Sequence, residues 1–251
     1  MKKTVKIVAF CFALLFSALY ASAEEKTFFI PGKGKLTREV SLQHIQELDS
    51  RGRVTSEESE SGPRTFYSYD KKGRLLLLSS GDFQISYDYN KKGFLTHTKN
   101  SDGLEEWYEY DKNGLLLMIK DSEGYGKKYS YDQTGKLIEL SEIEFSQGES
   151  EDEGEILLYS ERYTYNNAGQ KVKMEYSYGD SILYSYDEEG RLIKESYSSG
   201  NYKEYIYSKE GKLLFTCEKQ DDYEVESFFV YELTEDGKVK KIKEYYITIY
   251  G

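Results

Sequence analysis

The sequence predicts an all-β protein made of tandem β-hairpin repeats. We expect the hairpins to join into one long, curled antiparallel sheet, either an open spiral or a shell fragment. The first observation is a Tyr-x-Tyr-Asp-x-x-Gly motif, clear at residues 67–73, that recurs down most of the chain. The second is the alternation of apolar and polar residues before each motif, which is the period of a half-buried strand. The third is composition: the 251 residues include 26 Tyr and only 2 Pro, and Tyr favours the pleated surface of a sheet.

The first expected element is a secretory signal peptide over residues 1–23. Lys2, Lys3 and Lys6 precede an apolar run, and Ala21-Ser22-Ala23 matches a cleavage site. We expect cleavage after Ala23 and export to the periplasm or the cell surface of a bacterium. The apolar run is short for a membrane span, so the mature chain is not expected to be membrane-spanning. An outer-membrane β-barrel is a further alternative for the whole chain, and it is disfavoured because the expected strands are too charged to form an apolar lipid-facing band.

The mature chain divides into a capping segment over residues 24–45 and a repeat domain over residues 46–251. The repeat has nine copies, each anchored by a glycine 20 or 21 residues from the next, except for two longer spacings of 34 and 26 residues. The longer one contains an expected acidic loop at about 146–156. The anchors are Gly52, Gly73, Gly93, Gly114, Gly135, Gly169, Gly190, Gly211 and Gly237.

Each motif is expected to form a hairpin turn between two strands. Asp or Asn at the first turn position can accept hydrogen bonds from backbone amides ahead of it, and Gly can adopt a positive φ. The Tyr pairs recur beside every turn, which favours cross-strand packing over a ligand platform. The turn residues that we single out are Asp70, Gly73, Asp111, Gly114, Asp132, Gly135, Asp187 and Gly190.

Residues 69–75, 131–137 and 186–192 resemble the YD-repeat, or Rhs-repeat, family, and we interpret the chain as a short exported bacterial member. The resemblance implies hairpins strung into a spiralling sheet. In large members that sheet encloses a C-terminal toxin, and some members are linked to carbohydrate or cell-surface binding. We find no Asp-Pro-x-Gly-Leu-like cleavage motif here. At this length we expect neither a toxin domain nor a closed shell.

Trp107 is the most informative single side chain. Tyr108 and Tyr110 have the phase of the covered face, so Trp107 points to the opposite face beside Glu105 and Glu109. Exposed aromatic residues next to hydrogen-bonding groups are typical of sugar or protein binding. The alternative is that this second face packs against another part of the curled sheet. The candidate ligand contacts are therefore Trp107, Glu105, Glu109 and Phe66. Phe66 holds the position equivalent to Trp107 two repeats earlier.

Other chemistry finds little support in the sequence. The histidines, His44 and His97, fit strand surfaces and lack the spacing of a metal site. Cys217 reads as a small buried hydrophobe. The acidic loop lacks the order of a calcium-binding loop. We therefore expect no cofactor, no metal and no catalytic residue. The net charge of −11 argues against a nucleic-acid partner.

The resulting hypothesis is a non-catalytic interaction or structural module of the bacterial envelope. It would bind a protein or glycan through an extended β-sheet surface, and exposed sheet edges would allow self-association between chains. The alternative is an envelope enzyme that acts on polysaccharide with paired carboxylates. A deep pocket with two converging carboxylates would favour the enzyme, and a smooth curved sheet would favour binding.

Overall fold

The computed structural model describes residues 23–59, 62–145 and 154–251, which form nineteen strands and no helix. The signal peptide lies outside the described residues except for Ala23. Most of the acidic loop lies outside them too, and Glu155 and Ile156 belong to a strand. The strands are β1 Glu24–Ile30, β2 Gly34–Leu48, β3 Val54–Ser59, β4 Thr65–Tyr69, β5 Leu75–Ser80, β6 Phe83–Tyr89, β7 Leu95–Asn100, β8 Glu105–Tyr110, β9 Leu116–Asp121, β10 Tyr125–Tyr131, β11 Leu137–Phe145, β12 Glu155–Tyr165, β13 Lys171–Tyr176, β14 Ser181–Tyr186, β15 Leu192–Tyr197, β16 Tyr202–Tyr207, β17 Leu213–Lys219, β18 Tyr223–Leu233 and β19 Val239–Tyr250.

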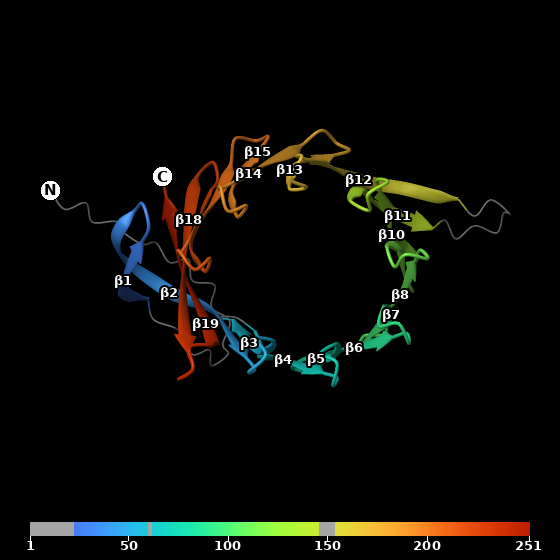
Figure 1. Cartoon of the computed structure of the whole chain (residues 1–251), viewed down its shortest axis with the longest axis horizontal. Coiled ribbons are helices and arrows are strands. Elements are labelled where there is room, and N and C mark those ends of the chain that lie inside the picture. Colours follow the sequence, from blue (N-terminus) through green and yellow to red (C-terminus); the bar gives the residue numbers. More distant parts are fainter. Residues whose placement is uncertain (1–22, 60–61, 146–153) are drawn as a thin grey trace, which may run out of the picture.

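The sheet closes on itself, which corrects the expectation of an open spiral (Figure 1). Each strand from β2 to β19 pairs antiparallel with its neighbours in sequence, and β19 returns to pair with β2 from Lys241 opposite Glu47 to Tyr246 opposite Ser41. The result is an eighteen-stranded barrel. Of the described strands, β1 is the one outside the ring, and it pairs with the first part of β2.

A β-bulge in every repeat explains the curvature. In the first clear copy Ser68 opposes Leu77 while Tyr69 opposes Leu75, so Leu76 is an extra residue. Such bulges bend a strand and increase its twist, and their repetition lets a sheet curl and close. The register shift falls at Leu48, Tyr69, Tyr89, Tyr110, Tyr131, Tyr165, Tyr186, Tyr207 and Leu233.

The turns share one hydrogen-bond pattern. Asp70 Oδ1 accepts the backbone N–H groups of Lys72 and Arg74 at 2.8 and 2.9 Å. The Gly73 N–H donates to the Asp70 carbonyl at 3.0 Å, and Gly73 has a φ of 88°. The Arg74 N–H holds the pKa of the Asp70 carboxyl below its usual range. The local sequence thus stabilises the turn before any long-range contact forms.

The tyrosine pairs of the repeats face the inside of the ring, and the second tyrosine of most pairs links its repeat to the preceding one. The Tyr69 hydroxyl donates to the Val54 carbonyl of the preceding repeat at 2.7 Å. The Arg53 guanidinium lies 4.6 Å from the Tyr69 ring centroid. The basic residue of one copy thus covers the tyrosine of the next. The other hydroxyl donors of this kind are Tyr89, Tyr131, Tyr165, Tyr186, Tyr207 and Tyr231.

The main apolar core lies where the N-terminal hairpin packs against the outer side of β17–β19 (Figure 1). The Phe28 and Phe228 rings stack with centroids 4.1 Å apart. Arg38 donates from Nε to Glu226 at 2.6 Å, and the Glu226 side chain is buried. Residues 24–45, the expected capping segment, form β1 and most of β2, and this segment covers a part of the ring wall.

No helix within the described ranges is long and apolar enough to cross a membrane.

Candidate binding surface on the outer face

Trp107 lies on the outer face of the ring, in the middle of β8. Paired residues point to the same side of a sheet, and Trp107 pairs with His97 of β7 and Lys120 of β9. Its neighbour Tyr108 points inward and donates its hydroxyl to Glu106 at 2.7 Å. The indole is 43% exposed. A row of three different side chains therefore crosses β7–β9 on the outer wall.

His97 is held between two carboxylates. Its Nδ1 is 3.2 Å from Asp88 Oδ2, and its Nε2 is 3.0 Å from Glu105 Oε2. Ionised carboxylates only accept hydrogen bonds, so this geometry favours the form of the ring that carries a proton on both nitrogens. The Asp88 hydrogen bond, and after it that of Glu105, raises the pKa of His97. The imidazole ring lies 5.7 Å from the Trp107 ring, centroid to centroid. The indole therefore rests beside an imidazole ring that two carboxylates hold in place.

Ion pairs also fix the polar rim of the surface. The Lys99 ammonium donates to Glu105 Oε1 at 2.6 Å, and this contact, followed by His97, lowers the pKa of Glu105. Lys120 lies 3.5 Å from Glu109 on the other side of the indole. Hydrogen-bonding groups of both signs thus surround Trp107 in set positions. We call His97, Glu105, Trp107, Glu109 and Lys120 the Trp107 surface.

The Trp107 surface has the chemistry of a sugar platform. An exposed indole offers an apolar face on which a ring can stack and an N–H that can donate a hydrogen bond. Carboxylates and ammonium groups at its rim can accept from and donate to hydroxyls. Because these groups stand on three paired strands, they are held more rigidly than loop residues would be.

The structure brings together three of the four predicted ligand contacts. Glu105, Trp107 and Glu109 share one strand face, whereas Phe66 stands on β4, four strands away. At about 4.8 Å per strand the separation is roughly 19 Å, so Phe66 belongs to another part of the wall. Sequence reasoning missed Lys120 and the part that His97 plays here. Counting outward from the turn at residues 101–103 would have placed His97 opposite Trp107.

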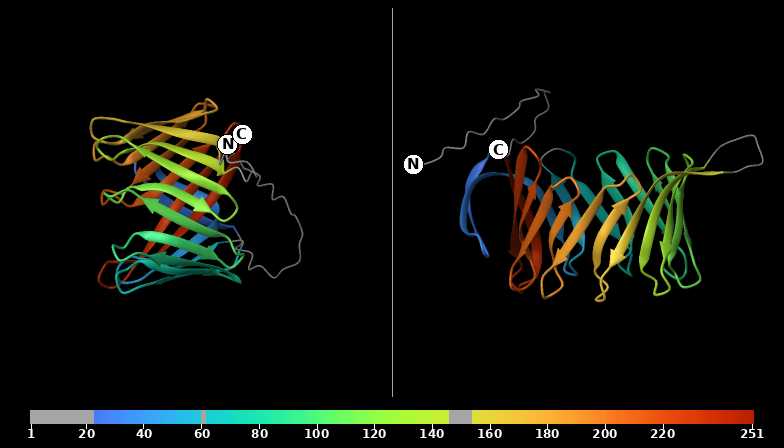
Figure 2. Two further views of the ribbon diagram at one scale, coloured as in Figure 1. Left: turned by 90° about the vertical axis from the view of Figure 1, so that its right-hand side faces the viewer. Right: turned by 90° about the horizontal axis from the view of Figure 1, so that it is seen from above.

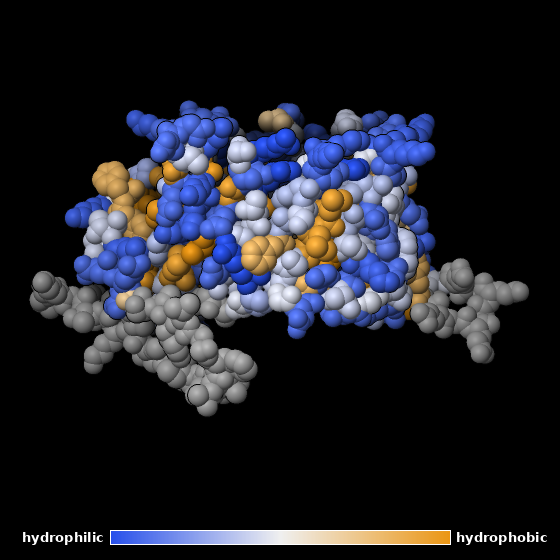
Figure 3. Space-filling model, turned by 90° about the horizontal axis from the view of Figure 1, so that it is seen from below, coloured by the Kyte–Doolittle hydropathy of each residue, from blue (hydrophilic) through white to orange (hydrophobic). Residues whose placement is uncertain are grey.

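The outer wall around the ring is a mixture of apolar and charged side chains. Figure 3 views the molecule from the side formed by β3–β6 and shows apolar groups as separate patches between hydrophilic ones. The alternative that the second face is covered by another part of the sheet holds for β17–β19, where the N-terminal hairpin lies. Around Trp107 the described residues leave the face open.

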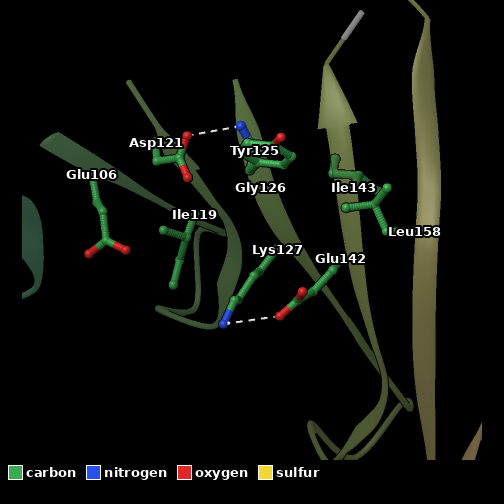
Figure 4. Close-up of a pocket in the computed structure, with 9 residues that line it drawn as sticks. All are labelled: Glu106, Ile119, Asp121, Tyr125, Gly126, Lys127, Glu142, Ile143 and Leu158. Carbon is green, nitrogen blue, oxygen red and sulfur yellow. Dashed lines mark hydrogen bonds and ion pairs between the residues drawn. The ribbon is translucent and has the colours of Figure 1, made fainter. Parts of the chain in front are cut away.

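The enzyme alternative requires two converging carboxylates in a pocket, and the inner face of the ring carries several carboxylates. A pocket of about 280 Å³ is lined by residues that include Glu106, Asp121, Lys127 and Glu142 (Figure 4). Glu106 on β8 and Glu142 on β11 are three strands apart, roughly 14 Å at 4.8 Å per strand. Glycosidase carboxylates lie within about 10 Å of each other. Ile119 lies between these two side chains, and Lys127 pairs with Glu142 at 3.2 Å.

The closer pair, Glu106 and Asp121, consists of carboxylates that already have partners. These two residues oppose each other on β8 and β9. Glu106 Oε2 accepts the hydroxyls of Thr98 and Tyr108 at 2.9 and 2.7 Å. Asp121 Oδ1 accepts the N–H groups of the turn that follows it. Both carboxylates therefore have a structural explanation within the wall.

No group of three metal-ligating side chains occurs in the part of the chain that the structure describes. Cys217 is buried in the core beneath the N-terminal hairpin. Burial raises the pKa of its thiol to about 12, which leaves little thiolate for nucleophilic attack at neutral pH.

A comparison with protein families decides the family. The model described as the Teneurin YD-shell matches residues 36–233, well over half of the chain. The chain belongs to the Teneurin YD-shell family. The resemblance to YD-repeat proteins is confirmed, and so are the repeat and all-β character of the chain. The repeat unit that the motif defined is thus the unit of a YD-shell.

Several solved structures are similar to this YD-shell chain. The pore form of the Tc holotoxin of Photorhabdus luminescens is 18% identical over 87% of this chain and 13% of that one, with a TM-score of 0.37. The TcdB2-TccC3 structure is 12% identical over 83% and 17%, with a TM-score of 0.39. A porin-like protein from Bacteroides uniformis is 12% identical over 83% and 95%, with a TM-score of 0.44.

The chain therefore spans 13% and 17% of the lengths of the two toxin chains. No curated protein matches the chain significantly.

Proposed function

We propose that this YD-shell chain is an exported, non-catalytic binding module of the bacterial envelope, and that it binds a glycan at the Trp107 surface. The observation that carries the proposal is the exposed indole of Trp107, flanked by His97 and Lys120 on paired strands. The chain has one Trp, and its side chain lies on the open part of the outer face. A side chain of that size exposed among fixed polar groups is typical of recognition.

A binding role agrees with the energetics of the ring. The bulges, turns and tyrosine links hold the wall in one shape, so little conformational entropy remains to be lost when a ligand binds. The neighbouring carboxylates of the inner pocket, Glu106 and Asp121, already accept hydrogen bonds from a tyrosine hydroxyl and from turn N–H groups. These features favour a rigid platform over a hydrolytic centre.

The proposed location rests on the first residues of the chain. The basic start, the apolar run and Ala21-Ser22-Ala23 would direct export. After cleavage Cys217 is the remaining cysteine, so the fold needs no intrachain disulfide. We propose the periplasm or the cell surface as its compartment, where envelope glycans are present.

The experiment compares the mature chain with Trp107→Ala on an array of bacterial surface polysaccharides. The matched control is Phe66→Ala, because Phe66 is an outer-face aromatic that is 51% exposed and lies outside the Trp107 surface. We expect at least a tenfold loss of affinity for Trp107→Ala and unchanged binding for Phe66→Ala, with equal melting temperatures. Absence of glycan binding by the parent chain, or equal losses in both variants, would overturn the proposal.

A further inference from the structure

The β11–β12 hairpin extends from the ring as an arm (Figures 1 and 2). It occupies the longest spacing between anchor glycines, the place where the repeat is interrupted. On one side β12 pairs with β11 from Glu155 to Arg162. On the other side β12 pairs with β13 only from Glu161 to Tyr165. Within the described ranges, Glu155 to Tyr159 therefore present an open strand edge.

The open edge carries an apolar run. Ile156, Leu157 and Leu158 are consecutive and are 51, 58 and 48% exposed. Continuous apolar runs are typical of strands covered on both faces, whereas each of these three side chains is about half exposed. A bulge at Leu158, opposite Glu142 and Ile143, prevents strict alternation of the three side chains. Natural edges are usually blunted by Lys or Pro, and neither residue occurs between Glu155 and Tyr159.

Charge indicates what would cover the edge. The strand segment carries Glu155, whose carboxylate pairs with Lys128, and Glu161 nearer the ring, and the whole chain has a net charge of −11. Two copies of such a chain repel each other at long range. A strand with apolar side chains and flanking Lys or Arg residues would instead find apolar contacts and opposite charge together.

We propose that the open edge of β12 binds an extended segment of a partner protein, apolar at alternate positions and basic at its ends, by β-strand addition. The main chain of the partner would hydrogen-bond to the edge from Glu155 to Tyr159, and its apolar side chains would cover Leu157 and its neighbours. This mode derives affinity from backbone bonds and specificity from alternate side chains. The edge lies four strands from Trp107, so the two proposed sites are separate.

The test uses a fluorescent peptide, Lys-Val-Thr-Val-Thr-Val-Lys, titrated with the mature chain and followed by anisotropy. We expect saturable binding that weakens at least tenfold in Leu157→Lys, because a charge blocks the edge. The matched control is Leu183→Lys. Leu183 is 52% exposed on the outer face, but its strand is paired on both sides. Its variant should bind the peptide like the parent chain.

Two methylated peptides test the bonding mode without changing the protein. Each is methylated on one of the two alternate sets of backbone nitrogens and keeps every side chain, and strand addition predicts loss of binding for the peptide whose methylated set faces the edge. Absence of binding by the parent peptide, or parent-like binding of both methylated peptides, would overturn the proposal. A dimer of the parent chain in sedimentation that Leu157→Lys abolishes would also overturn it, because a second copy would then occupy the edge.

Discussion

At the residue scale, His97 and Trp107 form the most specific arrangement in the molecule. Asp88 and Glu105 stabilise the charged imidazole, so its pKa lies above the ordinary value. A group whose pKa is raised by folding stabilises the fold fully below its unfolded pKa and loses that contribution as pH rises through the folded pKa. Because Trp107 is the one tryptophan of the chain, its fluorescence can report the protonation of the neighbouring His97.

We predict that Trp107 fluorescence rises as His97 loses its proton, because an imidazolium quenches a nearby indole more strongly than a neutral imidazole. The midpoint should lie above the ordinary histidine value of about 6.5. Intrinsic emission of the mature chain, titrated between mildly acidic and mildly alkaline pH, measures it. The His97→Gln variant should show a flat profile, and His44→Gln should titrate like the parent. A transition that persists in His97→Gln would contradict the assignment.

The turn aspartates give a second prediction at this scale. The hydroxyl and N–H of Thr134 and the N–H of Lys136 donate to Asp132 Oδ1. Asp132→Ala removes this acceptor and should lower the melting temperature, whereas Asp132→Asn should change it little. Asn166 already fills this position in the next repeat, where its side chain accepts the Gln170 N–H at 3.0 Å. Equal melting temperatures for the Ala and Asn variants would show that the side-chain acceptor does not matter.

At the element scale, the unit is a hairpin whose turn residue reaches the next hairpin. In several copies the residue after the anchor glycine covers the second tyrosine of the following copy, as Arg53 covers Tyr69. In one copy this residue is Phe94, whose ring stacks on Tyr110 at 5.0 Å. The same position can thus be filled by a cation or an aromatic ring, because both lie favourably on a tyrosine face.

The Phe94 contact allows a test by paired glycine substitutions. A Cβ on Gly114 would lie 2.6 Å from Phe94 Cζ, whereas a Cβ on Gly93 would meet nothing within 4 Å. Both glycines have positive φ. Gly93→Ala should therefore cost only backbone strain of about 1–2 kcal/mol, and Gly114→Ala a further 1–3 kcal/mol or so from overpacking. Denaturant unfolding measures both costs.

Phe94→Leu should relieve part of the additional cost of Gly114→Ala, because a shorter side chain leaves room for the new methyl group. Unfolding of the double variant measures this relief. If Gly93→Ala and Gly114→Ala were equally destabilising, the Phe94–Tyr110 stack would not be the packing contact that the structure indicates.

The N-terminal hairpin provides the last prediction at this scale. Phe228 is fully buried between Phe28 and Phe215, whereas its neighbour Phe229 points to the inner face and is half-buried. Phe228→Ala should cost about 3–5 kcal/mol, and Phe229→Ala should cost less. Trypsin cleavage at Lys33 and Lys35 should accelerate in Phe228→Ala alone. Equal cleavage rates in both variants would contradict the docking of the hairpin on the outer wall.

The repeat, its turns and the shared face of its tyrosines could be predicted from the sequence, because each depends on residues that are close together in the chain. Asp70, Gly73 and Tyr69 interact within the turn or with the preceding repeat, about 15 residues away. The bulge at Leu76 was not predicted, because Leu75 to Leu78 form one apolar run in which no alternation marks the extra residue. The pairing of His97 with Trp107 was not predicted, because it depends on the register between two strands. That register can be worked out only when the length of the connecting turn is known.

At the scale of the whole molecule, closure depends on contacts that no single repeat contains. The strands at the two ends of the repeat array, β2 and β19, carry backbone groups that pair with each other over six residue pairs. The register of that seam is set by the summed curvature of nine bulged hairpins. A period in the sequence can show that a sheet curls. Whether its two end strands meet depends on how the bends of all the hairpins add up in three dimensions.

The most direct test of the closed ring is a cysteine cross-link across the seam. Glu47 on β2 and Lys241 on β19 are opposite each other, with their charged groups 3.3 Å apart. In mature chain carrying Cys217→Ala, the pair Glu47→Cys and Lys241→Cys should form an intramolecular disulfide on mild oxidation. The pair Glu39→Cys and Lys241→Cys should not, because Glu39 lies on the part of β2 that pairs with β1. The closed ring predicts a cross-linked monomer for the first pair alone, and free thiols or cross-linked dimers there would contradict it.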